Sequence, residues 1–341
     1  MTKLLIIRFS SIGDIVLITP VLRAIRQQLD GETEVHVLTK KNYASVLDGN
    51  PHIAMVHTMN NTVQEVIPSL MDENFDYIID LHNNIRSRVV KRKLKCLAFT
   101  VKKYNIQKWL WVNCGINRMP KNHIVERYLE TLKAFGVQPD EQGLEYYIPN
   151  TEQFIESELP EIMQKPFIAF AIGATHDGKK LSEGRILEVV KNIQKPFVLI
   201  GGKEDRVVGE AITTACGGRV LNACGIWSLH KSADAVRRAE LVLTGDTGMM
   251  HIASAFGKKI ISLWGCTVPG LGMSAYKSHP SSIIIEPQPR SRFRFHSRPC
   301  SKLGNRCKFG MDKRCIDQIE IAEINRAIET LWAPQTTPST P

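Results

Sequence analysis

No stretch of this 341-residue sequence approaches the ~20 consecutive apolar residues that a membrane-spanning helix needs. The apolar run at residues 4–7 ends at Arg8, and no secretory signal pattern is present. Signatures of helix-turn-helix, zinc-finger and RNA-binding modules are also missing. We therefore expect a cytoplasmic protein without a nucleic-acid partner.

The glycine-rich fingerprint of dinucleotide-binding folds is a further absence. A Gly-x-Gly-x-x-Gly sequence would follow the first strand and hold a pyrophosphate at a helix N-terminus. Here the first candidate strand leads into RFSSIGDIVLITP, residues 8–20, where Gly13 is the single glycine and Asp14 follows it directly. A carboxylate stands where a phosphate would usually bind, and the missing fingerprint argues against an NAD-dependent oxidoreductase.

Closely spaced cysteine pairs are missing as well, although the chain has eight cysteines. Five are scattered and are interpreted as small core residues: Cys96, Cys114, Cys216, Cys224 and Cys266. The other three, Cys300, Cys307 and Cys315, cluster near the end without a C-x-x-C pair. We expect a structured loop there rather than a metal site.

The chain does have an excess of positive charge. Its formal net charge is +10, within an otherwise ordinary globular composition of 43% hydrophobic and 23% charged residues. Two segments, 86–103 and 290–298, concentrate the basic residues. Such an excess predicts an acidic partner, such as a phosphorylated substrate or an anionic lipid, although charge runs are also typical of a solvated face.

Strand-like apolar runs alternate with amphipathic helical segments throughout, which predicts parallel sheets covered by helices on both faces. The predicted strands are LLIIRF, EVHVLT, MVHTM, YIIDLH and LAFTV in the first half, and FIAFAIG, FVLIGG, RVLNA, LVLTG and KIISLWG in the second. Helices are expected over residues 13–29, 182–193 and about 316–332. Pro20 should kink the first or delay its regular part, and Ser182 should cap the second.

Residues 146–160 interrupt this alternation with prolines and acidic residues and are predicted to be a linker. The expected organisation is an N-terminal domain over 1–150, a C-terminal domain over 151–332, and a disordered Pro/Thr-rich tail over 333–341. Ligands of parallel sheets bind at the carboxyl ends of the strands. Two such domains would therefore share a ligand-binding cleft.

One loop of the second half suits a diphosphate. The stretch LVLTGDTGMMHIASAFG reads as strand, turn and helix, with Asp246 and Thr247 as candidate N-cap residues. Gly248 would let a ligand approach the backbone, and the free N–H groups of the first helical turn would face the cleft. A capped core helix without a ligand is the alternative.

Two further loops of the second half follow strands on the same side. GATHDGKKL contains Thr175 and Lys179, and a lysine would stabilise a departing diphosphate. IGGKEDR contains Gly201, Glu204 and Asp205, and a carboxylate after a glycine pair suits the two hydroxyls of a ribose. Either loop could also be ordinary surface.

Together, SSIGDIVLITPVLRAI, GATHDGKKLS, IGGKEDR and GDTGMMHIASAFGKKIISLWGCTVPG resemble glycosyltransferase family 9, the heptosyltransferase family of lipopolysaccharide core assembly. The resemblance extends over about residues 1–330. It implies a GT-B fold, in which two doubly wound, Rossmann-like domains face a central cleft. The nucleotide-sugar donor would bind the C-terminal domain and the lipid acceptor the N-terminal one. An inverting transfer without a bound metal or other cofactor is also implied.

The resemblance further implies roles for single residues. Asp14 matches the catalytic carboxylate, Lys179 the lysine that contacts the donor and assists its departure, and Glu204 or Asp205 the ribose-binding acid. The family sequence D-T-G-x-x-H is complete here, and the predicted donor site also includes neighbouring loop residues. These additional donor-site residues are Thr175, Gly201, Asp246, Thr247, Gly248 and His251. Many members carry Trp-Pro after the lysine, whereas this chain has KKLSEGR, which leaves the donor sugar open.

The acceptor is expected to be an anionic glycolipid. The predicted acceptor-binding residues are Ser10, Ser11 and Gly13 beside Asp14, and Arg86, Arg88 and Lys91 in the basic segment. The same basic residues could contact an anionic membrane surface. We therefore expect a peripheral protein at the cytoplasmic face of the inner membrane.

The predicted reaction is a single displacement. The acceptor hydroxyl, deprotonated by Asp14, attacks the sugar, while Lys179 and the backbone at residues 247–248 stabilise the leaving diphosphate. Family frequency alone favours ADP-heptose as donor. Two alternatives stay open: another nucleotide-sugar donor, or a catalytically silent sugar-nucleotide-binding protein, which would keep the second-half loops but have no need of Asp14.

Overall fold

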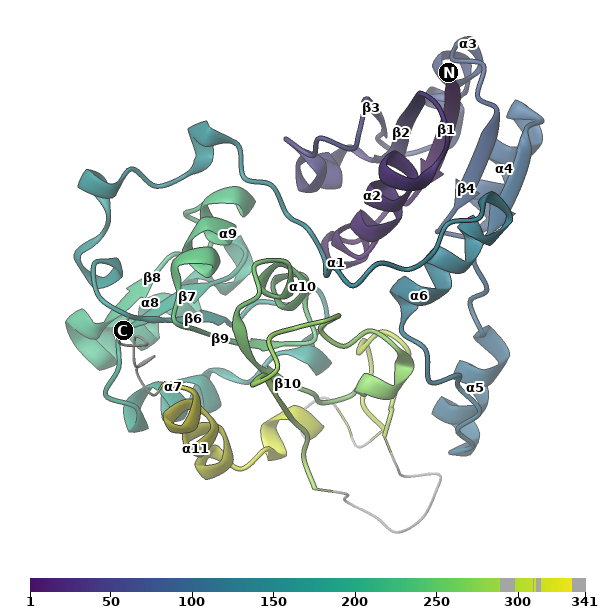
Figure 1. The fold of residues 1–341 in the computed structure, drawn as a ribbon. Helices are drawn as coiled ribbons and strands as arrows, with labels where there is room; N and C mark the ends of the chain where they lie inside the picture. The colour runs from purple at the N-terminus through teal and green to yellow at the C-terminus, as the bar shows by residue number, and fades with distance from the viewer. Residues whose placement is uncertain (289–297, 309, 311–313, 333–341) are drawn as a thin grey trace, which may run out of the picture.

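The computed structural model describes residues 1–288, 298–308, 310 and 314–332. The basic segment 290–298, apart from Arg298, and the predicted tail 333–341 lie outside the described residues. The chain folds into two lobes, each built on a parallel sheet (Figure 1). No described helix has both the length and the apolar character needed to cross a bilayer.

The N-terminal lobe has a five-stranded sheet in the order β3-β2-β1-β4-β5. Its strands are β1 (Thr2–Ile7), β2 (Thr33–Lys40), β3 (Met55–Met59), β4 (Tyr77–Asp80) and β5 (Leu97–Thr100). Its helices are α1 (Ile12–Val16), α2 (Thr19–Gln28), α3 (Ile67–Asp72), α4 (Ile85–Leu94), α5 (Asn105–Cys114) and α6 (Ile124–Leu129). All neighbouring strands are parallel, so their carboxyl ends share one edge.

The C-terminal lobe has a six-stranded parallel sheet in the order β11-β10-β9-β6-β7-β8. Its strands are β6 (Ile168–Ala171), β7 (Phe197–Ile200), β8 (Val220–Asn222), β9 (Leu241–Gly245), β10 (Lys259–Leu263) and β11 (Ile283–Ile285). Its helices are α7 (Glu183–Asn192), α8 (Arg206–Cys216), α9 (Leu229–Arg238), α10 (Gly248–Ala255) and α11 (Ile321–Leu331).

Alternation along the central strand explains why both faces of the first sheet are covered. Successive side chains of a strand point to opposite faces. Leu4 and Ile6 of β1 belong to one core cluster with residues of α2 and α6, whereas Leu5 and Ile7 belong to a second cluster with residues of α3 and α4. All four β1 side chains are fully buried, as a doubly covered parallel strand requires.

All ten predicted strands are present, and the structure adds β11. The short run Ile283–Ile285 was not predicted, and it pairs with β10 at the edge of the sheet. The predicted helix over 182–193 is confirmed as α7, with Ser182 at its N-cap. Pro20 does delay a helix, because α1 ends at Val16 and α2 begins at Thr19 with the proline in its first turn.

The prediction for the last helix was wrong at its start. Residues Cys315–Gln318 form a 3-10 turn, and α11 begins only at Ile321. Ile319 between them is extended, with its carbonyl accepting a hydrogen bond from Arg185 of α7. Asp317 accepts another from the backbone N–H of Ser182 at 2.8 Å. Because Asp317 and Ile319 make these contacts to the start of α7, the chain before Ile321 does not continue as an α-helix.

Between Gly136 and Phe167 the chain contains only three short 3-10 turns. The predicted linker and the boundary expected at residue 150 fall in this irregular stretch, and the exact domain division remains a prediction. The two lobes also contact each other directly, because α1 and α10 lie side by side (Figure 1). Ile124 at the start of α6 donates from its backbone to Gly272 in the opposite lobe at 2.9 Å.

Candidate active site between the lobes

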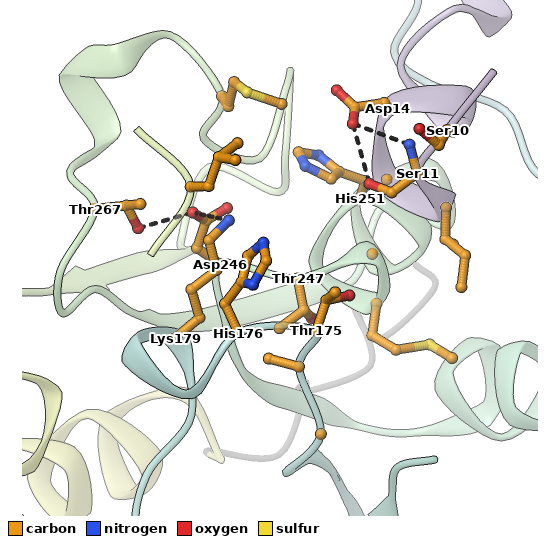
Figure 2. A pocket seen from close by; sticks show the side chains of 18 of the residues that line it. Ser10, Ser11, Asp14, Thr175, His176, Lys179, Asp246, Thr247, His251 and Thr267 are labelled. Atoms are coloured by element: carbon orange, nitrogen blue, oxygen red, sulfur yellow. Dashed lines mark hydrogen bonds and ion pairs between the residues drawn. The ribbon is translucent and has the colours of Figure 1, made fainter. Parts of the chain in front are cut away.

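A cavity of about 780 Å³ lies between the lobes, at the carboxyl edges of both sheets. The N-terminal lobe contributes the loop after β1, with Arg8, Ser10, Ser11, Gly13 and Asp14. The C-terminal lobe contributes the loops after β6, β7, β9 and β10. All predicted donor-site residues line this cavity, as Figure 2 shows for most of them.

Asp14 is held by three interactions on the N-terminal side. One carboxylate oxygen accepts hydrogen bonds from the backbone N–H and the hydroxyl of Ser11, at 3.1 and 3.0 Å (Figure 2). The other oxygen pairs with the guanidinium of Arg8. Burial alone would raise the pKa of Asp14, but the Arg8 guanidinium and the hydrogen bonds from Ser11 hold it below its ordinary value. The carboxylate is therefore ionised at neutral pH.

Arg8 is a buried residue that sequence reasoning missed. Its guanidinium donates to the carbonyl oxygens of Leu81 at 2.7 Å and Ser10 at 3.1 Å. These two backbone groups fix the position of the guanidinium independently of Asp14. The only sequence signal for it was its place at the end of β1, six residues before Asp14. Asp14 also reaches back to the N-cap residue of α1, so the same side chain caps the helix and lines the cavity.

On the C-terminal side, Lys179 and Asp246 form an ion pair at 2.8 Å (Figure 2). The same Asp246 oxygen accepts a hydrogen bond from the hydroxyl of Thr267, also at 2.8 Å. Lys179 comes from the loop after β6, Asp246 from the loop after β9 and Thr267 from the loop after β10. Parallel strands bring these three loops together, which places an ammonium group in the cavity with a fixed orientation.

Helix α10 begins beside this ion pair, with Thr247 as its N-cap. The N–H groups in the first turn of a helix have no partner within the helix and attract anions. Gly248, the first residue of α10, closely approaches α1, because a Cβ built on it would lie 2.8 Å from Cγ2 of Ile12. Close packing explains glycine here, next to the atoms that would meet a diphosphate.

His251 lies one turn into α10 and is only 3% exposed. Burial lowers the pKa of His251 to about 4, so its imidazole is neutral at pH 7. Within the described residues its Nδ1 has no hydrogen-bond partner. The ring packs on Gly13, since a Cβ there would be 2.6 Å from its Cδ2, and it thereby joins the donor-side helix to the Asp14 loop.

The two acids that the sequence left as alternatives are used differently. Asp205 is buried, accepts the backbone N–H of Gly202 at 2.9 Å and lies 3.3 Å from the ammonium of Lys180. Glu204 is exposed and lines the cavity. Thr175 lines the same cavity from the neighbouring loop, and Trp227 and Leu229 were not anticipated there. Both acids line the cavity, but Glu204 is the exposed one, whereas the carboxylate of Asp205 contacts its own turn and Lys180.

The basic segment 86–103 is divided by the fold. Arg86 and Arg88 lie exposed on α4, outside the residues that line the cavity. Lys91 is tied to Asp80 and to the hydroxyl of Thr100, both at 2.8 Å. The last residue of the segment, Lys103, does line the cavity.

Lys108 on α5 also lines the cavity, and sequence analysis did not single it out. Burial, followed by the nearby cation Arg127, lowers the pKa of Lys108 to about 8. Burial and Arg8 lower the pKa of Lys103 in the same way. Lys103 and Lys108 therefore place positive charge in the cavity close to other cations, and an anionic ligand bound there would reduce the repulsion among them.

Two groups of side chains among the described residues have the spacing of metal ligands. One consists of Cys266, Cys300 and Cys307, and the other of His36, His57 and Glu73. Neither group is among the residues that line the cavity. The residues that line the cavity offer arginine and lysine side chains, the N–H groups at the start of α10, and the carboxylates of Asp14, Glu204, Asp205 and Asp246.

Two Rossmann-like sheets that open onto one cleft, with a carboxylate on one side and an anion-binding helix and lysine on the other, define a glycosyltransferase of the GT-B class. The family model described as glycosyltransferase family 9 (heptosyltransferase) matches residues 63–292. The chain belongs to this family, and it is a glycosyltransferase that uses a nucleotide-sugar donor.

The relatives agree with this assignment. Lipopolysaccharide core heptosyltransferase OpsX of Haemophilus influenzae is 24% identical over 275 residues, which cover 77% of this chain and 78% of that protein. The crystal structure of a family 9 glycosyl transferase from Veillonella parvula superposes with a TM-score of 0.76 at 19% identity and 97% coverage of both chains. The E. coli heptosyltransferase WaaC with ADP gives a TM-score of 0.68 at 18% identity, covering 97% of this chain and 100% of that one.

Proposed function

We propose that this glycosyltransferase transfers heptose from ADP-heptose to a sugar hydroxyl of a lipopolysaccharide core acceptor, with inversion at the anomeric carbon. Family membership supports the reaction class, and the name of the Haemophilus relative supports the sugar and the acceptor. The structure of the similar E. coli heptosyltransferase WaaC with ADP supports the nucleotide.

The observation that carries the proposal is the opposition of two kinds of groups across one cavity. The Asp14 carboxylate belongs to the N-terminal lobe, while Lys179 and the start of α10 belong to the C-terminal lobe (Figure 2). A displacement needs a proton acceptor on one face of the sugar and anion stabilisation on the other. The arrangement meets both needs when the donor sugar lies between the lobes.

The reaction would proceed in one step. The acceptor oxygen forms a bond to the anomeric carbon, its proton passes to the Asp14 carboxylate, and the bond from that carbon to the diphosphate oxygen breaks. ADP leaves with the bonding electron pair, and its growing charge is stabilised by Lys179 and the N–H groups of α10. Because Arg8 lowers the pKa of Asp14, the base is weak, so much of the rate enhancement would come from positioning the reactants.

The nucleoside would occupy the part of the cavity near β7. Glu204 would accept hydrogen bonds from the ribose hydroxyls, and Trp227 offers an aromatic surface near the same loop. On the acceptor side, Ser10 and Ser11 offer hydroxyl groups, and Lys103 and Lys108 offer charge to the anionic groups of a lipopolysaccharide core.

Contact with the inner membrane surface is proposed for two helices. Helix α5 exposes Ile106 at 72% and Trp109 at 52%, beside the cationic wall of the cavity. Helix α4 exposes Arg86 and Arg88, which suit anionic headgroups rather than the cavity. An apolar residue with an interfacial tryptophan near basic side chains is typical of peripheral membrane contact.

The proposed function is tested by supplying purified protein with ADP-heptose and a heptose-free lipopolysaccharide core, and following ADP release and product mass. Asp14→Asn should lower kcat by about 10²- to 10⁴-fold, since the base is lost, while the Kd for ADP changes by less than about twofold. Preserved turnover, or loss of ADP binding in this variant, would contradict the assigned role. If the wild type binds ADP but shows no turnover with any donor, it is a catalytically silent binding protein. If it transfers sugar only from other nucleotide sugars, the donor is not ADP-heptose.

The acceptor assignment predicts a contrast between two pairs of basic residues. Replacing Lys103 and Lys108 together by alanine should raise the acceptor KM about tenfold and weaken its dependence on salt, because both lysines line the cavity. Replacing Arg86 and Arg88 by alanine should leave that KM unchanged and reduce sedimentation with phosphatidylglycerol vesicles. An acceptor KM that responds to the α4 pair instead would reverse the assignment.

A further inference from the structure

Four cysteines from distant parts of the sequence meet beside the loop that carries Lys179. Cys266 follows β10, Cys300 and Cys307 lie in the segment 298–308, and Cys315 begins the 3-10 turn before α11. The Sγ atoms of Cys266, Cys300 and Cys307 all lie within 4.8 Å of one another. The Cys300 thiol is also within hydrogen-bond range of both Cys266 and Cys315.

Ordinary core packing does not explain this cluster. Its buried members are Cys266, Cys300 and Cys315, with Cys307 packed against them, and no aliphatic or aromatic residue among the described residues belongs to it. By contrast, the buried Cys224 is one member of a large aliphatic core. A cysteine side chain buries little apolar area, so four of them contribute little hydrophobic stabilisation to a segment with almost no regular secondary structure.

The spacing does match a tetrahedral metal site. With Zn–S bonds of about 2.3 Å, neighbouring sulfur atoms are about 3.8 Å apart. The sulfur atoms of Cys266, Cys300 and Cys307, all within 4.8 Å of one another, need only small shifts to reach this separation. The backbone N–H of Lys308 donates to the Cys300 sulfur, and such outer hydrogen bonds accompany metal-bound thiolates. We infer that Cys266, Cys300, Cys307 and Cys315 form a structural tetrathiolate site for one thiophilic ion, Zn²⁺ or iron.

The site is connected to the Lys179 loop through backbone hydrogen bonds. The N–H of Cys266 donates to the carbonyl of Gly178 at 3.3 Å, and the N–H of Gly178 donates to Gly304 at 3.1 Å. A Cβ on Gly178 would lie 2.8 Å from the Cys266 sulfur, and one on Gly304 would lie 2.7 Å from Cγ of Lys179. A bound ion would therefore hold the segment that packs on Lys179, while Thr267, next to Cys266, positions Asp246.

The test begins with metal content. Untagged wild-type protein, analysed by inductively coupled plasma mass spectrometry, should contain about one equivalent of zinc or iron per chain. Cys300→Ser and Cys307→Ser should each lose most of it, whereas the control Cys216→Ser, on α8 and outside the cluster, should retain it. Wild-type protein without either metal, or full retention in both cluster variants, would overturn the inference.

A second measurement does not depend on whether the variants fold. Wild-type protein whose metal is exchanged for Co²⁺ should show the intense visible bands of tetrahedral cobalt and the near-ultraviolet thiolate charge-transfer bands. A disulfide between any two of the four cysteines, found by mass spectrometry of the native protein, would overturn the site. The expected influence of the metal on the position of Lys179 rests on the proposed function. If Lys179 binds the donor diphosphate, removal of the metal should weaken ADP binding about tenfold. If transfer activity were absent while the metal was bound, the site would stand and the proposed function alone would fail.

Discussion

At the scale of single residues, similar side chains perform different tasks because of their immediate surroundings. Glu204 and Asp205 are adjacent in sequence and both line the cavity, yet Glu204 is exposed whereas Asp205 is buried and closes its own turn. Asp14 combines both tasks, since it accepts hydrogen bonds from Ser11 and faces the cavity beside Arg8. Proximity in sequence therefore says little about which acid a ligand can reach.

This difference predicts opposite outcomes for two conservative substitutions. Glu204→Gln should weaken ADP binding about five- to tenfold and leave Tm unchanged, because an exposed carboxylate is lost from the proposed ribose site. Asp205→Asn should lower the free energy of unfolding by about 2 kcal/mol, because a buried, hydrogen-bonded ion pair with Lys180 is broken. Calorimetric titration with ADP and urea unfolding separate the two effects. Equal effects of both variants on ADP affinity at unchanged stability would show that Asp205 also reaches the ligand.

At the scale of elements, the contact between α1 and α10 connects the two lobes at the site. Gly13 and Gly248 allow it, since a Cβ on either would approach the opposite helix to less than 3 Å. The short α1 is thereby held against the start of α10, with the His251 ring between Gly13 and the donor side. In the proposed reaction, the distance between Asp14 and the leaving diphosphate would depend on this contact.

Gly13→Ala is expected to damage both stability and turnover. The added methyl group would collide with His251 and should cost about 1–3 kcal/mol of unfolding free energy, as overpacking does. The matched control is Gly184→Ala in α7, where a Cβ meets no atom within 4 Å, and it should stabilise the protein by up to about 1 kcal/mol. Urea denaturation and kcat measurements check both variants. A Gly13→Ala variant as stable and as active as the wild type would show that the lobes can separate here without cost.

At the scale of the whole molecule, buried histidines make stability depend on pH. Burial lowers the pKa of His123 and of His251 to about 4, and burial together with Arg8 lowers that of His82 to about 3. His123 joins the lobes, because its Nε2 lies 2.9 Å from the carbonyl oxygen of Ser274. An unfolded histidine has a pKa near 6.5, so between about pH 6.5 and 4 the unfolded chain binds more protons than the native one.

Stability should therefore be complete above about pH 6.5 and decrease as the pH falls toward 4. Each of these histidines contributes up to about 2 kcal/mol of loss between pH 6.5 and 5. Acids whose pKa is lowered in the native state, such as Asp14, change stability only once the pH falls to the ordinary pKa of the carboxyl group, about 4. They therefore contribute little between pH 6.5 and 5. Urea unfolding at pH 8, 6.5, 5.5 and 5 measures the slope, and His123→Gln should reduce it. A stability that is constant from pH 8 to 5 would contradict the buried, neutral state of these side chains.

Most of the architecture followed from local features of the sequence. Ten strands were predicted from short apolar runs, and the effect of Pro20 followed from its missing N–H. The loops with Asp14, Lys179 and Asp246 were identified because each follows directly after a strand and forms a contiguous motif. Helix periodicity, strand runs and loop motifs are properties of neighbouring residues, and they can be recognised without knowing any distant contact.

Other features depended on contacts between residues far apart in the chain. Arg86 and Arg88 on α4 lie outside the cavity, whereas Lys108 on α5 and Lys103 in the loop before it line the cavity, and α4 and α5 lie in different parts of the N-terminal lobe (Figure 1). The start of α11 is delayed by hydrogen bonds from the start of α7. The sequence spacing of Cys300, Cys307 and Cys315 could not reveal that Cys266 lies beside them in the folded chain.

The order of apolar runs and strand-end loops was thus sufficient to define two parallel sheets, a shared cleft and the family to which the chain belongs. Which charges line that cleft, which of two adjacent acids is exposed and which cysteines meet were decided by the folded chain alone. The physical reason is that burial, pairing and ligation arise where separate segments come within a few ångströms, and the chain reaches those distances only when both lobes have formed.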